Sequence, residues 1–223
     1  AVFSGGGAGE YGTPCSRGER VGRALYVVDM QTGTMLRRFV DYLPTPGSAP
    51  SAAERIPAPI TGSPSLYNAF PGSLVTRGYV GDSEGRLYRI DMTSANPADW
   101  ELILFFDPSD ANDWPSGMTP PPGPFGPAAF KPALALGSDA TNRDLLIFYG
   151  LGEPGDTTPA GDTQAVIALR EKFDAQNVVL DPGTDGITPS AEYLWHVEFG
   201  GVNAASNNVR EKLTGKPIVV NNA

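Results

Sequence analysis

Short runs of β-branched and aromatic residues, each ending at a turn-forming residue, recur along this chain. Residues 24–29 (Ala-Leu-Tyr-Val-Val-Asp) return as residues 86–91 (Arg-Leu-Tyr-Arg-Ile-Asp) and, more weakly, as residues 165–170. Each copy follows another apolar run that passes into glycine, at residues 2–5, 78–82 and 146–150. Runs of this length between turn signals predict β-strands.

Two further runs extend the repeat to four predicted strands. Before the paired runs, residues 61–66 (Thr-Gly-Ser-Pro-Ser-Leu) match residues 214–219, with a looser copy at residues 130–134. A fourth run follows the Leu-Tyr strand, at residues 35–40, 100–106 and 195–199. Four-stranded units in series are typical of a β-propeller, whereas a β-sandwich has no repeat of whole units.

The turn after each Leu-Tyr strand carries an aspartate. Residues 29–33 (Asp-Met-Gln-Thr-Gly) have the form of a hairpin connection, in which Asp opens the turn and Gly accepts a positive φ. Asp29 and Asp91 occupy the same place in the repeat. We therefore expect both to accept backbone N–H groups of the following turn instead of forming a functional carboxylate pair.

The repeat predicts an all-β fold: a partial β-propeller domain of four-stranded antiparallel blades over residues 1–223. We expect the end of one blade, a complete blade, a blade with a long insertion and the start of a fourth, at residues 1–43, 56–107, 127–199 and 209–223. Closed propellers have about 4–8 blades, so the chain is expected to be a fragment of a longer protein. The proline-rich residues 44–59 and 107–126 are predicted surface connections.

Composition and charge narrow the class of protein. The 223 residues include 27 glycines and 22 prolines, almost twice the usual share of roughly 12%, which excludes a helical bundle and disfavours a doubly wound α/β fold. A hydrophobic content of 40% argues against disorder. The net charge of −9 disfavours nucleic acid as a partner. No run approaches the ~18 apolar residues of a transmembrane segment, and we find no signal peptide.

Residues 78–91 (Gly-Tyr-Val-Gly-Asp-Ser-Glu-Gly-Arg-Leu-Tyr-Arg-Ile-Asp) resemble the Y-x-G-D-x-x-G-x-L-W/Y-R-x-D signature of the PilY family, the type IV pilus tip-associated adhesins. Residues 211–221 are similar to the family's E-K/R-x-T-G-x-P-V-V-x-N segment, with Asn221 one position early. Residues 22–33 fit its G-x-A-L-Y-V-x-D-x-x-T-G blade, a pattern shared by most quinoprotein-like propellers. The similarity covers most of this chain but only part of the family's C-terminal propeller.

The resemblance implies a secreted, non-enzymatic protein of the cell surface or pilus tip, exported through the periplasm. It implies support of type IV pilus assembly and surface adhesion, with minor pilins, the pilus tip and a host or abiotic surface as partners. Variable loops on a rigid scaffold would make these contacts, and residues 44–59 and 107–126 are the predicted contact segments. Whether the full-length protein has the family's N-terminal von Willebrand A-like domain lies beyond this sequence.

Two other functions share the same pattern. A periplasmic quinoprotein (PQQ-type) dehydrogenase also has Leu-Tyr-x-x-Asp-x-x-Thr-Gly blades, but it needs a catalytic Asp, a quinone-stacking Trp and usually calcium, and no recognisable set is present here. An outer-membrane assembly scaffold is the third interpretation. We therefore predict no catalytic, cofactor-binding or metal-binding residues in this segment, with calcium possible elsewhere in the full-length protein.

The candidate sites that remain have simpler structural interpretations. Family members often carry a D-x-D-x-D-G calcium loop, but the corresponding residues 67–73 contain no acid, so we expect no calcium there. The matching loop of the next blade, residues 139–144, has Arg143 among its oxygen-bearing side chains. A polar turn is therefore favoured over a calcium site in that loop. His196, the only histidine, lies in a predicted strand. Residues 5–9 and residues 181–186 are predicted to be turns. Cys15 is predicted to be an exposed thiol. The aromatic residues Tyr26, Tyr79, Tyr88 and Phe148 are predicted to pack between blades.

Overall fold

A computed structural model of the chain describes residues 1–6, 22–44, 49–68, 74–137, 143–152, 163–173, 191–199 and 217–218. These residues form β-strands joined by turns and three short 3-10 helices, η1 (Pro50–Ala52), η2 (Pro97–Asp99) and η3 (Ala111–Asp113). Within them, no helix has the length and apolar character to cross a membrane. The all-β prediction is therefore confirmed.

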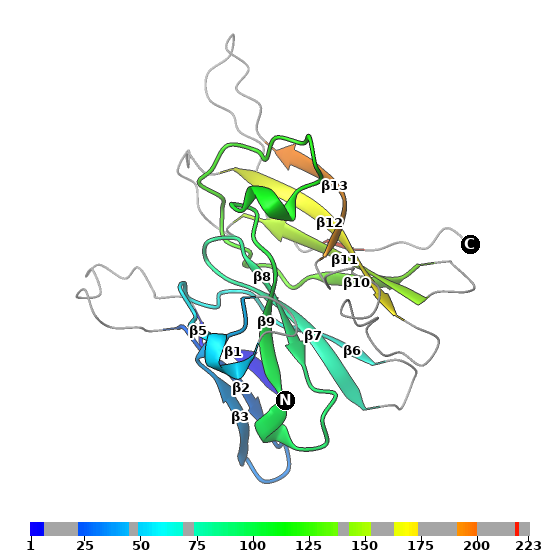
Figure 1. The fold of residues 1–223 in the computed structure, drawn as a ribbon. Coiled ribbons are helices and arrows are strands. Elements are labelled where there is room, and N and C mark those ends of the chain that lie inside the picture. Colours follow the sequence, from blue (N-terminus) through cyan, green and yellow to red (C-terminus); the bar gives the residue numbers. More distant parts are fainter. Residues whose placement is uncertain are drawn as a thin grey trace, which may run out of the picture.

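The larger sheets are antiparallel, and their strands follow one another in chain order (Figure 1). The first sheet has strands β1 (Val2–Ser4), β2 (Leu25–Val28) and β3 (Met35–Phe39). The second has β6 (Ser65–Asn68), β7 (Val75–Gly81), β8 (Leu87–Asp91) and β9 (Glu101–Phe106). The third has β10 (Ala133–Leu136), β11 (Arg143–Leu151), β12 (Gln164–Phe173) and β13 (Glu192–Phe199). A two-stranded sheet of β4 (Asp41–Tyr42) and β5 (Glu54–Arg55) completes the described strands, which form no closed ring.

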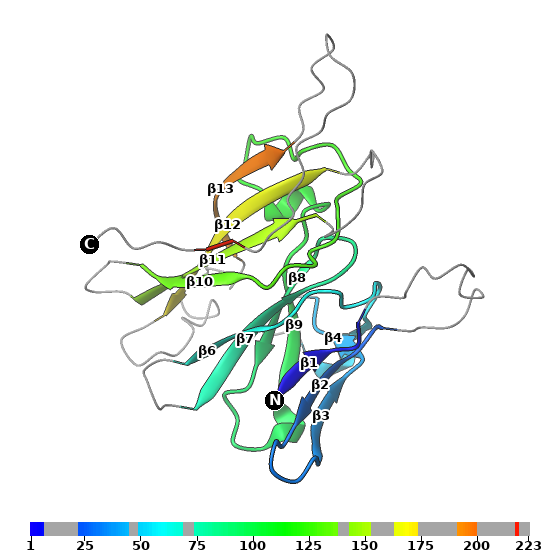
Figure 2. The ribbon, with the colours of Figure 1, turned by 180° about the vertical axis from the view of Figure 1, so that it is seen from behind.

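The second sheet lies between the other two, and its strands β7, β8 and β9 are mostly buried, whereas β6 alternates buried and exposed residues (Figures 1 and 2). Successive side chains of a strand point to opposite faces. Val80, Tyr88 and Ile90 therefore join one core cluster, which they share with Leu25 and Val27 of the first sheet. This double burial explains why β8 has no solvent-facing stripe of polar residues.

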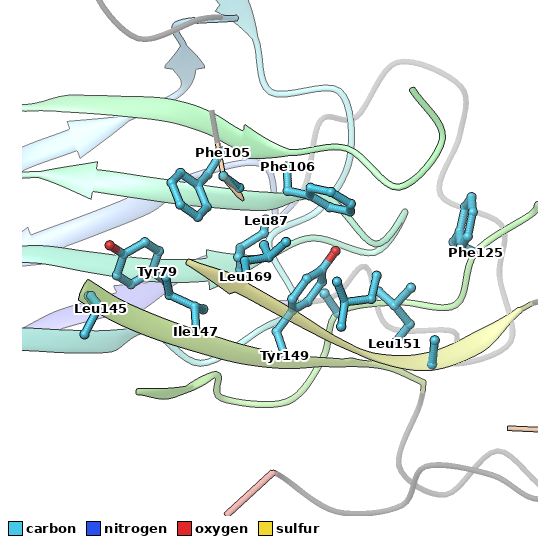
Figure 3. Close-up of a cluster of buried hydrophobic side chains, with 14 of the residues drawn as sticks. Tyr79, Leu87, Phe105, Phe106, Phe125, Leu145, Ile147, Tyr149, Leu151 and Leu169 are labelled. Carbon is cyan, nitrogen blue, oxygen red and sulfur yellow. The ribbon is translucent and has the colours of Figure 1, made fainter. Parts of the chain in front are cut away.

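The opposite face of the second sheet meets the third sheet in a larger core (Figure 3). Tyr79 and Leu87 from the second sheet lie against Ile147 and Tyr149 from β11 and Leu169 from β12. An ion pair is buried in the same interface, because Arg89 Nη1 lies 2.6 Å from Glu171 Oε1 and both side chains are about 95% buried. The Tyr79 hydroxyl donates to the same carboxylate.

The segment before β6 crosses between the first and second sheets and bonds to both. Ile60 N–H donates to Gly22 O of the first sheet at 2.9 Å, and Pro59 O accepts Ser83 N–H of the second sheet at 2.9 Å. The strand begins only at Ser65, although the sequence pattern predicted it from residue 61, because Pro64 has no backbone N–H to donate to the sheet.

The segment before β10 repeats this arrangement one sheet further on. Ala128 N–H donates to Asp82 O of the second sheet at 2.8 Å, and Pro127 O accepts Gly152 N–H of the third sheet at 2.8 Å. In both segments the residue after proline donates to a turn of the preceding sheet and the proline carbonyl accepts from a turn of the following sheet, although Gly22 lies before β2 and Asp82 lies after β7.

The predicted hairpin turns are confirmed. Asp29 Oδ1 accepts the N–H groups of Gln31 and Thr32 at 2.9 and 2.8 Å, and Gly33 has a φ of 73°. Asp91 Oδ1 likewise accepts Thr93 N–H at 3.0 Å. Both aspartates therefore stabilise turns.

The four predicted aromatic packing residues divide into two groups. Tyr79 and Tyr88 are fully buried between sheets. Tyr26 and Phe148 lie on the outer faces of the first and third sheets, where each packs on its own sheet: Tyr26 on Phe3, and Phe148 on Trp195, both at 5.8 Å between ring centroids.

Several predictions fall on residues outside the described ranges. They are Cys15, most of the glycine run 5–9, residues 69–73, residues 139–142, residues 181–186 and all of residues 209–223 except 217–218.

Candidate functional site

The turn between β7 and β8 is built around a buried carboxylate. Asp82 is fully buried, and its Oδ1 accepts the N–H groups of Glu84 at 2.9 Å and Arg86 at 3.0 Å. The Tyr88 hydroxyl donates to its other oxygen at 3.0 Å. Gly85 supplies the positive φ of 85° that the turn requires. Burial raises the pKa of Asp82, against the opposing effect of Arg86.

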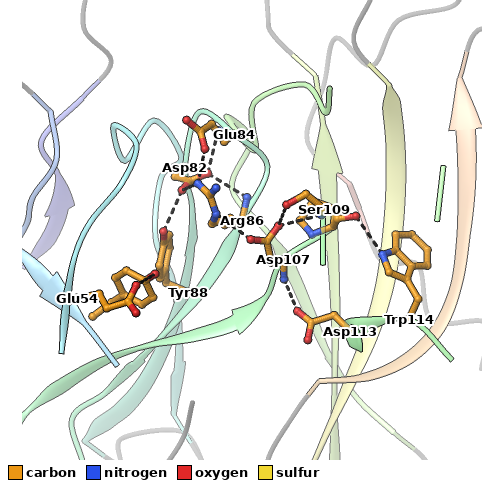
Figure 4. Close-up of polar contacts among 11 residues, drawn as sticks. Glu54, Asp82, Glu84, Arg86, Tyr88, Asp107, Ser109, Asp113 and Trp114 are labelled. Atoms are coloured by element: carbon orange, nitrogen blue, oxygen red, sulfur yellow. Dashed lines mark hydrogen bonds and ion pairs between the residues drawn. The ribbon is translucent and has the colours of Figure 1, made fainter. Parts of the chain in front are cut away.

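Arg86 joins this turn to the proline-rich segment that follows β9 (Figure 4). Its Nε lies 2.9 Å from Asp107 Oδ2, and its Nη1 lies 2.6 Å from Glu84 Oε2 and 3.4 Å from Asp82 Oδ2. One guanidinium group therefore balances three carboxylates, which raises the pKa of Arg86 although burial opposes that change.

Residues 107–113 are ordered by their own aspartates. Asp107 Oδ1 accepts Ser109 N–H at 2.9 Å, and Asp110 Oδ1 accepts Asn112 N–H at 2.9 Å at the start of η3. Asp113 Oδ2 accepts Asp107 N–H at 2.6 Å. Burial raises the pKa of Asp113 to about 6, with the charges of Asp110 and Asp107 adding to the rise.

Trp114 attaches the same segment to the hydrophobic core. Its side chain is buried, and its Nε1–H donates to Pro108 O at 3.0 Å. The indole contacts Phe106 edge to face at 5.5 Å and reaches Tyr193 and His196 of β13 at 5.3 and 5.2 Å. The segment is therefore held between the second and third sheets.

His196 lies in β13, as predicted, and its contacts are those of a packed strand residue. Its Nδ1 is 2.6 Å from the Tyr193 hydroxyl, and its Nε2 is 3.3 Å from Glu198 Oε1. No serine or cysteine of the described residues is bonded to its ring, so the structure brings no nucleophile to this histidine.

A pocket of about 450 Å³ lies where the turn meets the proline-rich segment. Its far side is fastened to the third sheet, since Thr163 N–H donates to Pro124 O at 2.7 Å and Gly126 N–H donates to Thr163 O at 2.9 Å. Proline rings and Phe125 share the walls with the polar side chains of Glu84, Arg86 and Ser109, and the Glu84 carboxylate is half-exposed. The lining residues are Glu84, Arg86, Pro108, Ser109, Pro120, Pro121, Gly123, Pro124 and Phe125.

The arrangement of this pocket suits binding more than chemistry. Its arginine is already engaged by carboxylates, and proline rings and Phe125 supply the apolar part of its walls. Over the described ranges, no three His, Cys, Asp or Glu side chains gather as a metal site. Prolines restrict the backbone, so the pocket can receive an apolar group of a partner without much loss of loop entropy.

The other predicted contact segment, residues 44–59, is described at residue 44 and from residue 49 onward. Its β5 strand pairs with β4, and Tyr42 OH donates to Glu54 Oε2 at 2.9 Å. Burial and this bond raise the pKa of Tyr42 to about 12. Arg55 Nε lies 3.1 Å from Asp41 Oδ1. The segment is therefore tied to the end of the first sheet.

Sequence reasoning selected the 107–126 segment but missed the Asp82–Arg86–Asp107 network that positions it. The Gly-Asp-x-x-Gly turn could have identified Asp82 as a turn residue. Arg86 and Asp107 are 21 residues apart in sequence, so their partnership has no local signal.

Comparisons of the chain with protein-family models, curated proteins and solved structures found no match.

Proposed function

We propose that the three larger sheets are consecutive blades of a β-propeller in a PilY-like, non-enzymatic protein of the type IV pilus tip. The propeller proposal is supported mainly by two crossing segments, the segments before β6 and before β10, which bond to their neighbouring sheets in a similar way. Pro59 and Ile60 bond to the first and second sheets in the way that Pro127 and Ala128 bond to the second and third. A constant relation between neighbouring sheets is what a radial repeat requires.

The outermost faces of the stack also favour further blades. On the third sheet, Trp195 and Val197 are 44% and 50% exposed, and on the first sheet Phe3 is 47% exposed. Apolar side chains at such exposure on a sheet face are typical of a surface that another element covers. In the proposed ring, neighbouring blades of a longer chain cover both faces.

The proposed role in pilus assembly and adhesion draws on the resemblance of residues 78–91 and on how those residues are built. The buried Asp82 and the bridging Arg86 make the signature turn a rigid support for the 107–126 segment. We propose that this segment and residues 44–59 contact minor pilins, or a host or abiotic surface, at the cell surface after export through the periplasm. No arrangement of described residues favours an enzymatic function.

The experiment is deletion of the full-length gene, with complementation by the intact gene and by a variant in which residues 115–124 are replaced with Gly-Ser repeats. We expect deletion to reduce both the number of surface pili and attachment. We expect the loop variant to be exported and folded but impaired in piliation or in attachment. Wild-type piliation and attachment in the deletion strain would refute the proposed function. Dye reduction by the purified full-length protein with added quinone cofactor and calcium would favour a dehydrogenase instead.

A further inference from the structure

A second groove lies between the outer strands of the first and second sheets. Its volume is about 350 Å³, and its walls come from β3, β4, η2 and β9. This size is within the range of pockets that hold small ligands. The groove is on the opposite side of the second sheet from the larger core cluster, and it takes no part in the contacts of the 107–126 segment. The residues that line the groove include Arg37, Phe39, Tyr42, Asp99, Trp100 and Glu101.

The floor of the groove is aromatic. Phe39 and Tyr42 are 3% and 8% exposed, and both belong to the core between the two sheets. Trp100 packs against the same core, and its Nε1–H donates to Ser94 O at 2.8 Å. The indole is therefore fixed in place with its polar atom already satisfied, so it offers apolar ring surface to a ligand.

Two opposite charges line the groove, and the charge of Arg37 acts to lower the pKa of Glu101 against the effect of burial. Arg37 comes from β3 and Glu101 from β9. Arg37 Nε is buried and has no hydrogen-bond partner among the described residues, and the guanidinium lies 5.4 Å from the centroid of the Phe39 ring. Burial and the nearby Asp91 raise the pKa of Glu101. Because Arg37 Nε is itself buried, a ligand in the groove would bond to the outer nitrogens of the guanidinium, and the Glu101 carboxylate would accept from a donor of the ligand.

The remaining charges limit the kind of ligand. Asp99 is exposed at the edge of the groove, where its Oδ2 accepts bonds from Ser94 and Asn96, and Asp41 is paired with Arg55. Carboxylates therefore outnumber the one uncommitted cation, which disfavours an anionic ligand. A sugar ring fits both the charged and the aromatic parts of the groove. Its hydroxyl groups can donate and accept hydrogen bonds, while its C–H face packs on aromatic rings.

We propose that this groove binds a neutral sugar ring, with Arg37 donating to a hydroxyl or ring oxygen, Glu101 accepting from a hydroxyl, and Trp100 packing on the apolar face. The proposal stands on the groove alone and does not depend on a pilus function. No other feature of the chain indicates a carbohydrate ligand.

The test is calorimetric titration of the full chain with the methyl glycosides of glucose, galactose, mannose and N-acetylglucosamine. N-acetylneuraminic acid serves as an anionic probe and methylguanidinium as a cationic one. The Trp100 indole N–H signal in NMR spectra, assigned with W100F, reports whether the ligand lies at this tryptophan. We expect at least one neutral glycoside to bind and to shift that signal.

Variants separate the groove from general effects. Arg37→Met and Glu101→Gln should each weaken binding by about tenfold, the effect of losing one hydrogen bond to a charged group. Arg38→Met is the matched control, because Arg38 is the next residue of β3 and lies over the ring of Tyr26 on the outer face; it should bind as the wild type does. Absence of a shift with every neutral glycoside, tighter binding of either charged probe, or equal effects of Arg37→Met and Arg38→Met would overturn the proposal.

Discussion

Asp113 shows how one carboxyl group can make the stability of this protein depend on pH. Its pKa is raised to about 6 because burial disfavours the charged form. A carboxyl whose folded-state pKa lies above its unfolded value binds its proton more tightly in the folded state. Its contribution to stability is therefore present below the unfolded pKa of about 4 and is lost as the pH rises through about 6.

Asp113→Asn should remove this dependence. The amide oxygen can still accept Asp107 N–H, while the charge is gone. We expect the variant to be more stable than the wild type by about 1 kcal/mol at pH 7, allowing for solvent screening of a partly exposed group, and equal to it below pH 4. Urea unfolding at pH 4, 5, 6 and 7 measures this. Asp99→Asn, at an exposed carboxyl, is the control, and a constant difference at all four pH values would contradict the explanation.

Gly81 of β7 lies directly against Ala128 in the segment before β10. A Cβ atom at this position would overlap both Cβ and O of Ala128. Gly81→Ala should therefore push the segment off the second sheet and reduce the free energy of unfolding by about 3 kcal/mol. At Gly123 the nearest atom to an added Cβ is in the Phe125 ring at 3.6 Å, an ordinary contact. Gly123→Ala is the control, and similar losses for the two variants in chemical denaturation would show that packing at Ala128 is not the cause.

At the scale of elements, the contact between β8 and β12 depends on the buried Arg89–Glu171 pair. A buried pair gives little net stability, but loss of one partner leaves an unpaired charge. We expect Arg89→Met and Glu171→Leu each to reduce stability by about 3–5 kcal/mol, and the double variant to lose much less than the sum. Denaturant unfolding of the cycle measures the coupling.

The exposed pair Arg170 and Glu192 on the same sheet supplies the control for that cycle. Its Arg170→Met and Glu192→Gln variants should each change stability by less than about 1 kcal/mol, because solvent screens the charges. Additive losses at Arg89 and Glu171 would mean that the two groups act independently and that the pair does not set how the sheets meet.

Most strands could be predicted because their patterns are local. Residues 2–5, 78–82 and 146–150 fall on β1, β7 and β11, whose alternating or fully buried runs end at glycine or turn residues. The strand β6 begins later than its pattern predicted, a difference that Pro64 could have indicated because proline has no backbone N–H. For the site, the prolines identified the 107–126 segment, but its anchors are tertiary: Trp114 reaches β13, and Arg86 reaches Asp107.

At the scale of the whole molecule, the middle sheet packs against both neighbours, and each outer sheet has one face in a core and exposed apolar side chains on the other. The composition agrees with this architecture. Glycine and proline are frequent because turns and crossing segments are frequent, and the net charge of −9 keeps the remaining surface acidic. The proline-lined pocket lies between the β7–β8 turn and the 107–126 segment. The aromatic groove lies between the first and second sheets.

The crossing segments have a consequence for how the chain can be divided. Ile60 bonds to the sheet before it while Pro59 accepts from the sheet after it, and Ala128 and Pro127 do the same one sheet later. Removing any one sheet would leave buried backbone groups of the adjoining segment without partners, which is costly. Folding free energy is thus coupled between nearest neighbours, as in linear repeat arrays. Unfolding should spread from an end of the series inward, with the second sheet the last to lose its protected amide hydrogens.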